Sequence, residues 1–273
     1  MKECYVDWFV NYEQQRSLSI NDRSISYGDG VFETLLICNG VIQRKQLHFQ
    51  RLTKGLHKLK FSISTTSLER LFGFIQSQCD RTKAHQGVKI IISRGEGGRG
   101  YWPSGDLTPS FLIGFFDYTV DRNLLSQGVM IDNALSRSTI NRQLAGIKHL
   151  NRLENVLAKQ ALDIDCYDAV MKDDDDFLTE CIQSNIFWVK NNVLYTPILN
   201  RSGVQGTVRN DIIHRAASLG VHTCIGHYKI ACLHNADEVF LCNSLIGIMP
   251  VTAIKNTVDY KIGTYTTLLQ QHI

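Results

Sequence analysis

Residues 144–154 read Leu-Ala-Gly-Ile-Lys-His-Leu-Asn-Arg-Leu-Glu, which places Lys148 between small residues and a leucine-rich segment. Alanine and glycine before the lysine allow another backbone to approach closely. The apolar neighbours would desolvate the ammonium group, which favours the neutral amine that attacks a carbonyl carbon. A lysine that forms a Schiff base needs such surroundings, although a lysine beside apolar residues more often extends to solvent. The stretch therefore indicates a candidate nucleophile that the rest of the chain must support.

The composition bounds the class of protein. A chain of 273 residues can bury a large core and hold two lobes. Its net charge of +3 is too small to indicate nucleic acid or an anionic membrane as a partner. Acidic residues near the start and the lack of a long apolar stretch favour a cytoplasmic protein over a secreted or membrane-spanning one. The eight cysteines form no Cys-x-x-Cys pair, so we expect reduced thiols and no metal site.

The first half of the chain predicts a mixed α/β lobe. Asn39-Gly40 is a strong hairpin signal between two apolar runs. Leucines at helical spacing predict a helix over residues 47–59, and Thr66-Ser67-Leu68-Glu69 has the capping-box pattern of a second helix. The predicted strands of this lobe are residues 31–38, 41–44, 87–93 and 111–116.

The second half predicts another strand-rich lobe, so the fold class is mixed α/β. We expect an N-terminal lobe over residues 1–117, a linker over 118–122 and a C-terminal lobe over 123–273. Four successive aspartates, residues 173–176, lack the EF-hand pattern and indicate a solvated turn. Residues 184–190 and 193–197 predict another hairpin, with its turn at Asn191-Asn192. The predicted helices of this lobe are residues 150–162, with Leu153, Val156 and Leu157 on one face, and 208–219.

Four separate features together suit a phosphorylated aldehyde cofactor. Lys148 could form the Schiff base. The glycine-bearing loop 203–207 leads into a helix N-terminus, where amide groups and the Thr207 hydroxyl would attract an anion. Arg51 offers a guanidinium fork for phosphate, and Glu180 could keep a pyridine nitrogen protonated. Each feature alone has an ordinary explanation, such as a helix cap or an exposed turn, so only their combination indicates a site.

A second glycine-rich loop spans residues 94–101, between two predicted strands. It has no Walker motif and no dinucleotide-binding motif in a strand-to-helix context. Two interpretations stay open for it: a mobile hairpin tip, or a loop that covers a substrate with Arg99 and Tyr101.

The chain resembles the fold-type IV pyridoxal-phosphate enzymes, which include branched-chain and D-amino-acid aminotransferases and 4-amino-4-deoxychorismate lyase. The matching motifs occur in the family's order and cover most of the chain. They are Tyr27-Gly28-Asp29-Gly30-Val31-Phe32-Glu33-Thr34, His48-Phe49-Gln50-Arg51-Leu52, the stretch around Lys148, Thr179-Glu180 followed by Ser184-Asn185-Ile186-Phe187, and Gly206-Thr207-Val208-Arg209. The sequence around Lys148 and the run Cys242-Asn243-Ser244-Leu245 are most similar to the lyase branch of the family.

The resemblance implies a role for each matching residue. Lys148 would bind pyridoxal 5′-phosphate covalently and move protons, and Glu180 would pair with the ring nitrogen. The remaining implied cofactor contacts are Arg51, Asn185, Gly206, Thr207, Val208, Asn243 and Ser244. The implied substrate contacts are Tyr27, Thr34, Arg99 and Tyr101.

The resemblance also implies an architecture and an activity. The expected protein is a homodimer with a small N-terminal α/β lobe and a larger C-terminal lobe that hold the cofactor. Its expected reaction on a small molecule is the elimination of pyruvate that yields 4-aminobenzoate for folate synthesis. The alternatives are an aminotransferase on the same scaffold and, more remotely, a protein that binds pyridoxal phosphate without turnover.

Overall fold

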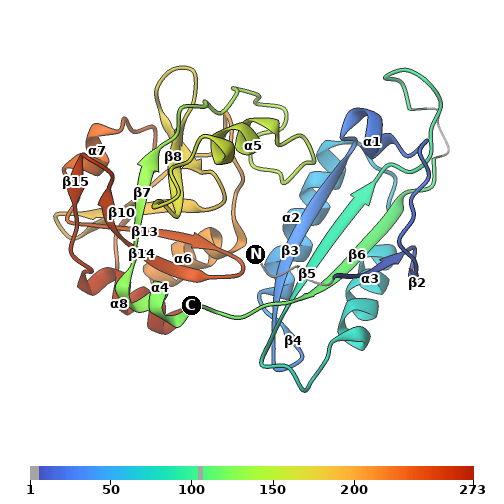
Figure 1. Ribbon diagram of the computed structural model, residues 1–273, viewed down its shortest axis with the longest axis horizontal. Coiled ribbons are helices and arrows are strands. Elements are labelled where there is room, and N and C mark those ends of the chain that lie inside the picture. The colour runs from blue at the N-terminus through green and yellow to red at the C-terminus, as the bar shows by residue number, and fades with distance from the viewer. Residues whose placement is uncertain (1–5, 104–106) are drawn as a thin grey trace. The chain divides into compact units, whose positions relative to one another are not determined.

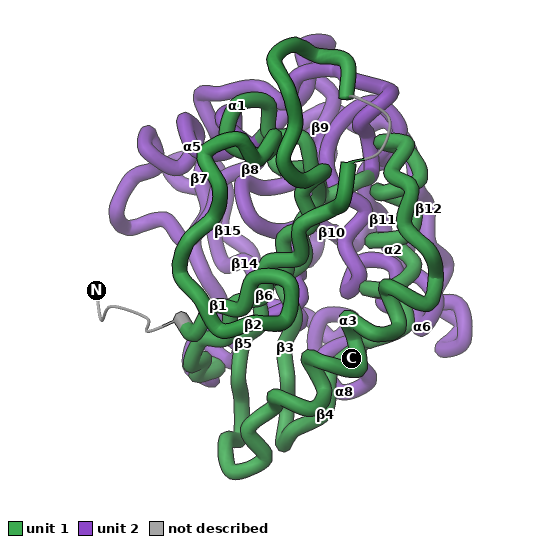
Figure 2. The backbone as a smooth tube through the Cα atoms, turned by 90° about the vertical axis from the view of Figure 1, so that its right-hand side faces the viewer, with its two compact units in different colours: residues 1–120, 147–151 green, residues 121–146, 152–273 purple. Residues whose placement is uncertain are grey.

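The computed structural model describes residues 6–103 and 107–273, and it confirms the mixed α/β class. Unit 1 comprises residues 1–120 and 147–151, and unit 2 comprises residues 121–146 and 152–273 (Figure 2). The first change of unit falls within the predicted linker, 118–122. The sequence places residues 147–151 in the C-terminal lobe, whereas in the structure they belong to unit 1, because their main chain pairs with a strand of that unit.

Unit 1 contains a six-stranded antiparallel sheet (Figure 1). The hairpin predicted at Asn39-Gly40 is confirmed, since the flanking strands pair and the two residues have φ values of 48° and 77°. Asparagine followed by glycine accepts this left-handed backbone at low cost. In spatial order the strands are β2 (Glu13–Gln14), β1 (Val6–Val10), β6 (Ser110–Asp117), β5 (His85–Ser93), β3 (Gly30–Cys38) and β4 (Val41–Ile42).

Two long helices cover one face of this sheet, and the short helix α1 (Arg23–Tyr27) precedes β3. The helix α2 (Lys45–Lys58) confirms the predicted helix, and α3 (Thr65–Gln78) follows it. The predicted capping box at Thr66 is wrong, because the Oγ atom of Ser64 accepts the hydrogen bond from the Ser67 N–H. Apolar side chains of α2, α3 and the inner face of the sheet form one core, which includes Leu35, Leu52 and Phe72.

Unit 2 contains a nine-stranded mixed sheet that curls on itself, since β9 at one end of the strand order lies beside β10. A second predicted hairpin, at Asn191-Asn192, is also confirmed, with φ values of 49° and 63°. The strands in spatial order are β12 (Thr223–Gly226), β11 (Val193–Pro197), β10 (Asn185–Lys190), β13 (Glu238–Asn243), β14 (Gly247–Ile254), β7 (Val129–Asn133), β8 (Asp168–Lys172) and β9 (Leu178–Cys181), and β15 (Val258–Asp259) pairs with β14.

Alternate residues of β10 face two different cores. Phe187 packs with apolar residues of α6 (Thr207–Ser218) and α8 (Thr264–His272), whereas Trp188 packs into the core inside the curled sheet. This arrangement follows from the two-residue period of a strand, and it requires both faces of β10 to be apolar. The remaining helices of the unit are α4 (Arg122–Gln127), α5 (Leu153–Gln160) and α7 (Ala231–His234).

The helix α5 is shorter than the predicted helix 150–162, and its apolar face is not buried. Leu153, Val156 and Leu157 are 77, 47 and 57 % exposed, and Ala158 is the buried residue of this helix. Helical spacing predicts a shared face but does not reveal which neighbour covers it. Over residues 6–103 and 107–273, no helix has both the length and the apolar character of a membrane span.

Candidate functional site

Lys148 is held in unit 1 by pairing of its main chain with β3. The Phe32 N–H donates to the Lys148 carbonyl oxygen over 2.8 Å, and the Leu150 N–H donates to the Gly30 carbonyl oxygen over 3.1 Å. A Cβ atom on Gly30 would lie 2.5 Å from the Ile92 carbonyl oxygen, so glycine is required for this approach. The Nζ atom of Lys148 lies 4.4 Å from the centre of the Phe32 ring. The lysine is therefore positioned by backbone hydrogen bonds and by an aromatic face.

A second lysine, Lys89, contacts the same aromatic ring. Its Nζ atom lies 3.6 Å from the centre of the Phe32 ring, and Lys89 is the direct β5 partner of Thr34 on β3. Burial lowers the pKa of Lys89 to about 8, although the Glu33 carboxylate opposes part of this shift. Lys89, Thr34 and Lys148 therefore gather around Phe32, on the sheet face opposite α2 and α3.

Lys89 was missed from the sequence because it lies within the apolar strand 87–93. The available signal was the two-residue period, which puts Lys89 on the face of Ile91 rather than that of Ile90 and Ile92. A charged residue at such a position on a central strand requires a polar or aromatic partner.

The substrate residues proposed from the sequence lie nearby in the same unit. Tyr27 ends α1, and its hydroxyl oxygen accepts a hydrogen bond from the Gly100 N–H over 3.0 Å. Arg99 and Tyr101 are exposed on the loop between β5 and β6, and the Tyr101 ring lies 5.7 Å from the Tyr27 ring. Unit 1 thus presents hydroxyl groups and cations, which are groups that bind carboxylates.

Arg51 lies in unit 1 within a buried ionic cluster with Glu33 and His48. Its Nε atom donates to Glu33 Oε1 over 2.7 Å and its Nη2 atom to Oε2 over 2.5 Å, while His48 Nδ1 lies 2.7 Å from the same carboxylate. Burial alone would raise the pKa of Glu33, but the charge of Arg51, together with the hydrogen bonds to Arg51 and His48, lowers it to about 2. Glu33 therefore fixes the orientation of the arginine predicted to contact phosphate.

In unit 2, Glu180 is held by neutral donors at the end of the loop 203–206. Its Oε2 atom accepts hydrogen bonds from the Val204 N–H over 3.0 Å and from the side-chain amide of Asn185 over 3.2 Å. The same Asn185 amide donates to the Val204 carbonyl oxygen over 2.9 Å. Asn185 thus holds the Glu180 carboxylate beside the loop 203–206, which leads into α6.

The N-terminus of α6 has the features of an anion site. Gly206 is the N-cap residue and supplies no side-chain cap, and a Cβ atom there would lie 2.0 Å from Asn185 Oδ1. Thr207 and Val208 form the first turn, and the N-terminus of a helix presents its amide groups to an anion. Arg209 is 5 % exposed; its Nη2 atom donates to the Pro197 carbonyl oxygen, but its Nε atom has no hydrogen-bond partner among the described residues.

Arg209 had no role in the sequence analysis, although it stands in a quoted motif. The signal was its spacing from Ile212 and Ala216, which puts it on the apolar face of the helix. A buried guanidinium group with an unused N–H is costly unless a ligand completes its hydrogen bonds. This observation fits a cofactor phosphate at the helix N-terminus.

Two further predicted residues shape the turn after β13. Asn243 Oδ1 accepts hydrogen bonds from the N–H groups of Leu245 and Ile246, which closes an Asx turn around Ser244. The Asn243 amide also approaches the carbonyl oxygen of Gln183 at 3.4 Å. The turn is therefore linked to the segment that directly follows Glu180 and Cys181.

The loop 203–206 also pairs with the residues that lead to Lys148. The Gly146 N–H donates to the Gly203 carbonyl oxygen over 2.8 Å, and the Gln205 N–H donates to the Gly146 carbonyl oxygen over 3.1 Å. Gly146 has a φ of 82°, which favours glycine. Only Ile147 separates Gly146 from Lys148, so the lysine follows this paired residue by two positions in the chain.

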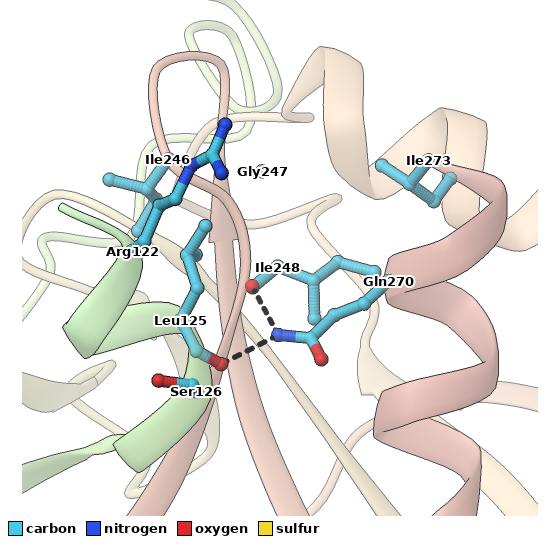
Figure 3. Close-up of a pocket in the computed structure, with 8 residues that line it drawn as sticks. All are labelled: Arg122, Leu125, Ser126, Ile246, Gly247, Ile248, Gln270 and Ile273. Atoms are coloured by element: carbon cyan, nitrogen blue, oxygen red, sulfur yellow. Dashed lines mark hydrogen bonds between the residues drawn. The ribbon is translucent and has the colours of Figure 1, made fainter. Parts of the chain in front are cut away.

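An open pocket of about 480 Å³ lies elsewhere in unit 2, beside α4, β14 and α8 (Figure 3). Gln270 spans it, because its side-chain amide donates to the carbonyl oxygens of Leu125 and Ile248 over 3.0 and 3.1 Å. None of the residues predicted for the site lines this pocket. Within the described part of the chain, no group of three or more acidic, histidine or cysteine side chains is arranged to hold a metal ion.

Residues 30–254 match the model of the amino-transferase class IV family. The chain belongs to this family. It is 35 % identical to the aminodeoxychorismate lyase of Vibrio harveyi, over 97 % of this chain and 99 % of that protein. It is 28 % identical to a D-alanine aminotransferase of Staphylococcus epidermidis, over 96 % and 93 % of the two chains. The crystal structure of 4-amino-4-deoxychorismate lyase from Pseudomonas aeruginosa has a TM-score of 0.91 and 34 % identity, with 97 % of each chain covered.

As a member of this family, the protein is an enzyme that depends on pyridoxal phosphate. The residues present fit this cofactor, since unit 2 offers a carboxylate for a ring nitrogen and a helix N-terminus with a buried arginine for a phosphate. Only Gln205 and Gly206 separate Val204 at the carboxylate from Thr207 at the helix. A compact ligand that bears both groups can therefore contact both ends of this loop.

Proposed function

We propose that the protein is a 4-amino-4-deoxychorismate lyase, which releases pyruvate and forms 4-aminobenzoate for folate synthesis. The observation that carries this proposal is the full-length similarity to lyases, at 35 % identity in sequence and a TM-score of 0.91 in structure. Similarity to a D-alanine aminotransferase is lower, at 28 %. Aminotransferase activity on the same scaffold is therefore the second candidate.

In this proposal, Glu180 and the loop 203–206 would hold the cofactor. The Glu180 carboxylate, oriented by Asn185, would accept a hydrogen bond from the protonated pyridine nitrogen. Pyridoxal phosphate, when bound, supplies an electron sink for the carbon that loses its proton. Arg209 and the first turn of α6 would hold the phosphate. The other proposed cofactor contacts are Arg51, Gly206, Thr207, Val208, Asn243 and Ser244.

Lys148 has two tasks in this reaction. Its amine would hold the cofactor, and the same amine would serve as the base of the reaction. As the base, it would remove the proton from the ring carbon that bears the substrate nitrogen. The carbon–oxygen bond to the enolpyruvyl group then breaks, and protonation of the released enol gives pyruvate. Because the remaining ring becomes aromatic, the protein contributes mainly orientation and proton transfer.

The cations of unit 1 suit the substrate, which carries two carboxylates. Lys89 lies beside Thr34 and approaches the same ring as Lys148, so it is placed to bind one carboxylate near the reacting carbon. Arg99 on the exposed loop is proposed for the other carboxylate, with Tyr27 and Tyr101 beside it. We therefore add Lys89 to the substrate contacts.

The test is a steady-state assay of pyruvate release from aminodeoxychorismate without any keto acid. The lyase proposal predicts turnover under these conditions, whereas a requirement for a keto-acid acceptor would identify an aminotransferase. Cofactor binding without turnover would identify a non-catalytic protein. Borohydride treatment followed by peptide mass analysis should find the cofactor on Lys148, and Lys148→Ala should reduce turnover by about 10²–10⁴-fold or more.

We also propose a cytoplasmic homodimer, on the basis of the resemblance to fold-type IV enzymes. Light scattering coupled to size-exclusion chromatography tests the oligomeric state. A monomer at the protein concentration of the activity assay would contradict it.

A further inference from the structure

Residues 95–101, which follow β5, are held by residues 21–29. At its base, the Arg23 N–H donates to the Gly95 carbonyl oxygen over 3.0 Å, and the Gly97 N–H donates to the Asn21 carbonyl oxygen over 3.1 Å. An isolated antiparallel bridge joins Asp22 to Glu96. The exposed segment that carries Arg99 is therefore not a free hairpin tip, because its first half is paired with the chain before α1.

The side chain of Arg23 binds the main chain of Gly100 and Tyr101, farther along the same loop. Its Nη1 atom donates to the Gly100 carbonyl oxygen and its Nη2 atom to the Tyr101 carbonyl oxygen, each over 3.0 Å. These are the two residues that follow Arg99. A guanidinium group has the planar fork that two successive carbonyl oxygens require, whereas a lysine ammonium lacks this geometry.

Arg23 is itself oriented by Asp29 and by the ring of Tyr27. Its Nε atom donates to Asp29 Oδ2 over 2.9 Å, and Asp29 also accepts a hydrogen bond from Arg94 Nε over 2.8 Å. The guanidinium carbon lies 4.6 Å from the centre of the Tyr27 ring, and Tyr27 in turn binds the Gly100 N–H. Arg23 is 3 % exposed, so its contacts are shielded from water. A buried arginine that binds main-chain carbonyls is strongly directional.

The stem of Arg23 also requires a glycine in the loop. A Cβ atom on Gly97 would lie 2.7 Å from Arg23 Cδ. Gly100, which binds both Arg23 and Tyr27, has a φ of 93°, a backbone conformation that favours glycine. Two of the loop glycines thus serve the clamp rather than flexibility.

We propose that Arg23 is a positioning residue, which clamps the loop 95–101 and thereby sets the direction in which Arg99 meets an anionic substrate. The side chain of Arg99 is exposed, and its main chain is fixed immediately after the residue by Gly100 and Tyr101. The clamp restricts the guanidinium of Arg99 before substrate binds, which reduces the ordering that binding would otherwise require. This inference rests on the proposed function for the role of Arg99, whereas the clamp itself is a property of unit 1.

The test compares Arg23→Ala with Arg70→Ala in the holoenzyme. Arg70 is a matched control, because its guanidinium also lies 4.6 Å from a tyrosine ring, that of Tyr12, which belongs to neither the segment 21–29 nor the loop 95–101. For Arg23→Ala we expect the KM for the substrate to rise about 10- to 100-fold with kcat nearly unchanged, since the loop loses orientation rather than chemistry. Arg70→Ala should leave both constants at their wild-type values.

Limited trypsin digestion supplies a readout that does not depend on the reaction. Cleavage after Arg99 should be about tenfold faster in Arg23→Ala than in Arg70→Ala. A tenfold change is what the loss of roughly one hydrogen bond would cause, since that loss lowers the local stability of the loop. Millimolar guanidinium chloride should lower the KM of Arg23→Ala toward the wild-type value by filling the vacated position. A general loss of structure would show no such rescue and would also change the absorption of the bound cofactor.

The outcomes separate the two proposals. Unchanged KM and unchanged cleavage after Arg99 in Arg23→Ala would overturn the clamp. Faster cleavage in Arg23→Ala, together with no pyruvate release by the wild-type enzyme, would support the clamp and reject the lyase. The KM would then be measured for the amino donor of the transamination. If Arg23→Ala does not fold, Arg23→Lys retains the charge and stem, and faster cleavage than in Arg70→Ala is again the expected result, with equal cleavage overturning the clamp.

Discussion

The two units treat buried charge in different ways. In unit 1, Glu33 lies at hydrogen-bond distance from the guanidinium of Arg51 and the imidazole of His48, and its pKa is lowered to about 2 despite complete burial. In unit 2, Glu180 accepts hydrogen bonds from amide groups, and the buried Arg209 retains an Nε–H with no partner in the described chain. Charges that neutralise one another stabilise a fold, whereas donors left unused by the protein indicate a ligand.

Arg51 differs from Arg209 in that a carboxylate already occupies part of its guanidinium group. Its Nε and Nη2 atoms already bind Glu33, so any phosphate contact must use other N–H groups of the same guanidinium. Arg209 lies directly on the helix that the sequence predicts for the phosphate. We therefore expect Arg51 to contribute orientation and long-range charge, and Arg209 to contribute a direct hydrogen bond.

Breaking the cluster of unit 1 should have the largest effect on stability. Glu33→Gln removes the negative charge that pairs with the buried guanidinium of Arg51, which should lower the free energy of unfolding by about 3–5 kcal/mol. Urea unfolding monitored by circular dichroism measures this change. A loss below about 1 kcal/mol, the range of surface ion pairs, would show that the cluster contributes little to the fold.

Neutralising the carboxylate of unit 2 should instead affect catalysis. Glu180→Gln keeps an oxygen that can accept the Val204 N–H but loses the charge that stabilises a pyridinium. Loss of one charge-assisted hydrogen bond, about 1.5–3 kcal/mol, corresponds to a decrease in kcat of about 10- to 100-fold. Stability in urea should change far less than for Glu33→Gln. The reverse pattern, stable activity with strong destabilisation, would contradict the assignment of Glu180 to the ring nitrogen.

Removing the unpaired guanidinium should weaken binding of the cofactor. Arg209→Met retains apolar volume on the face shared with Ile212, and we expect a loss of about tenfold in affinity for pyridoxal phosphate, with little loss of stability in the apoprotein. Titration of the apoprotein followed by absorption measures this affinity. The matched control is Arg215→Met on the same helix, an exposed residue paired with Asp211, which should bind the cofactor as the wild type does. Equal affinities for the two variants would remove Arg209 from the phosphate site.

A separate effect concerns pH and a third buried carboxyl. Asp168 in unit 2 accepts hydrogen bonds from Ser184 Oγ and the Ala169 N–H, and burial raises its pKa to about 6. A raised pKa favours the protonated form in the folded protein. Its stabilising contribution is therefore complete below the unfolded value near 4 and is lost as pH rises through about 6.

Asp168→Asn should consequently gain stability relative to the wild type between about pH 4 and 6, with no further gain above this range. Urea unfolding of both proteins at several pH values gives the difference directly. Glu33 has the opposite sign, because its lowered pKa gives a contribution that is present above its unfolded value and is lost as pH falls toward 2. A difference between Asp168→Asn and the wild type that does not change with pH would show that this carboxyl does not titrate near 6.

Local features could be predicted from the sequence because their causes are local. The turns at Asn39-Gly40 and Asn191-Asn192 are correct, since left-handed backbone is a property of these residues themselves. The helix start at Ser64 was missed by two positions, because several hydroxyl residues in succession can each act as a cap. The exposed face of α5 could not be foreseen, because spacing defines a face without defining its neighbour.

By itself, the sequence determined the order of the motifs, the family they resemble and the chemical type of each proposed site residue. The tertiary structure decided which charges meet. Glu33 and Arg51 are 18 residues apart and share a buried ion pair, Lys89 and Lys148 contact one aromatic ring, and Arg23 binds carbonyl oxygens more than 70 residues away. The physical reason is that electrostatic and hydrogen-bond energies depend on distance and desolvation, which a linear sequence does not record.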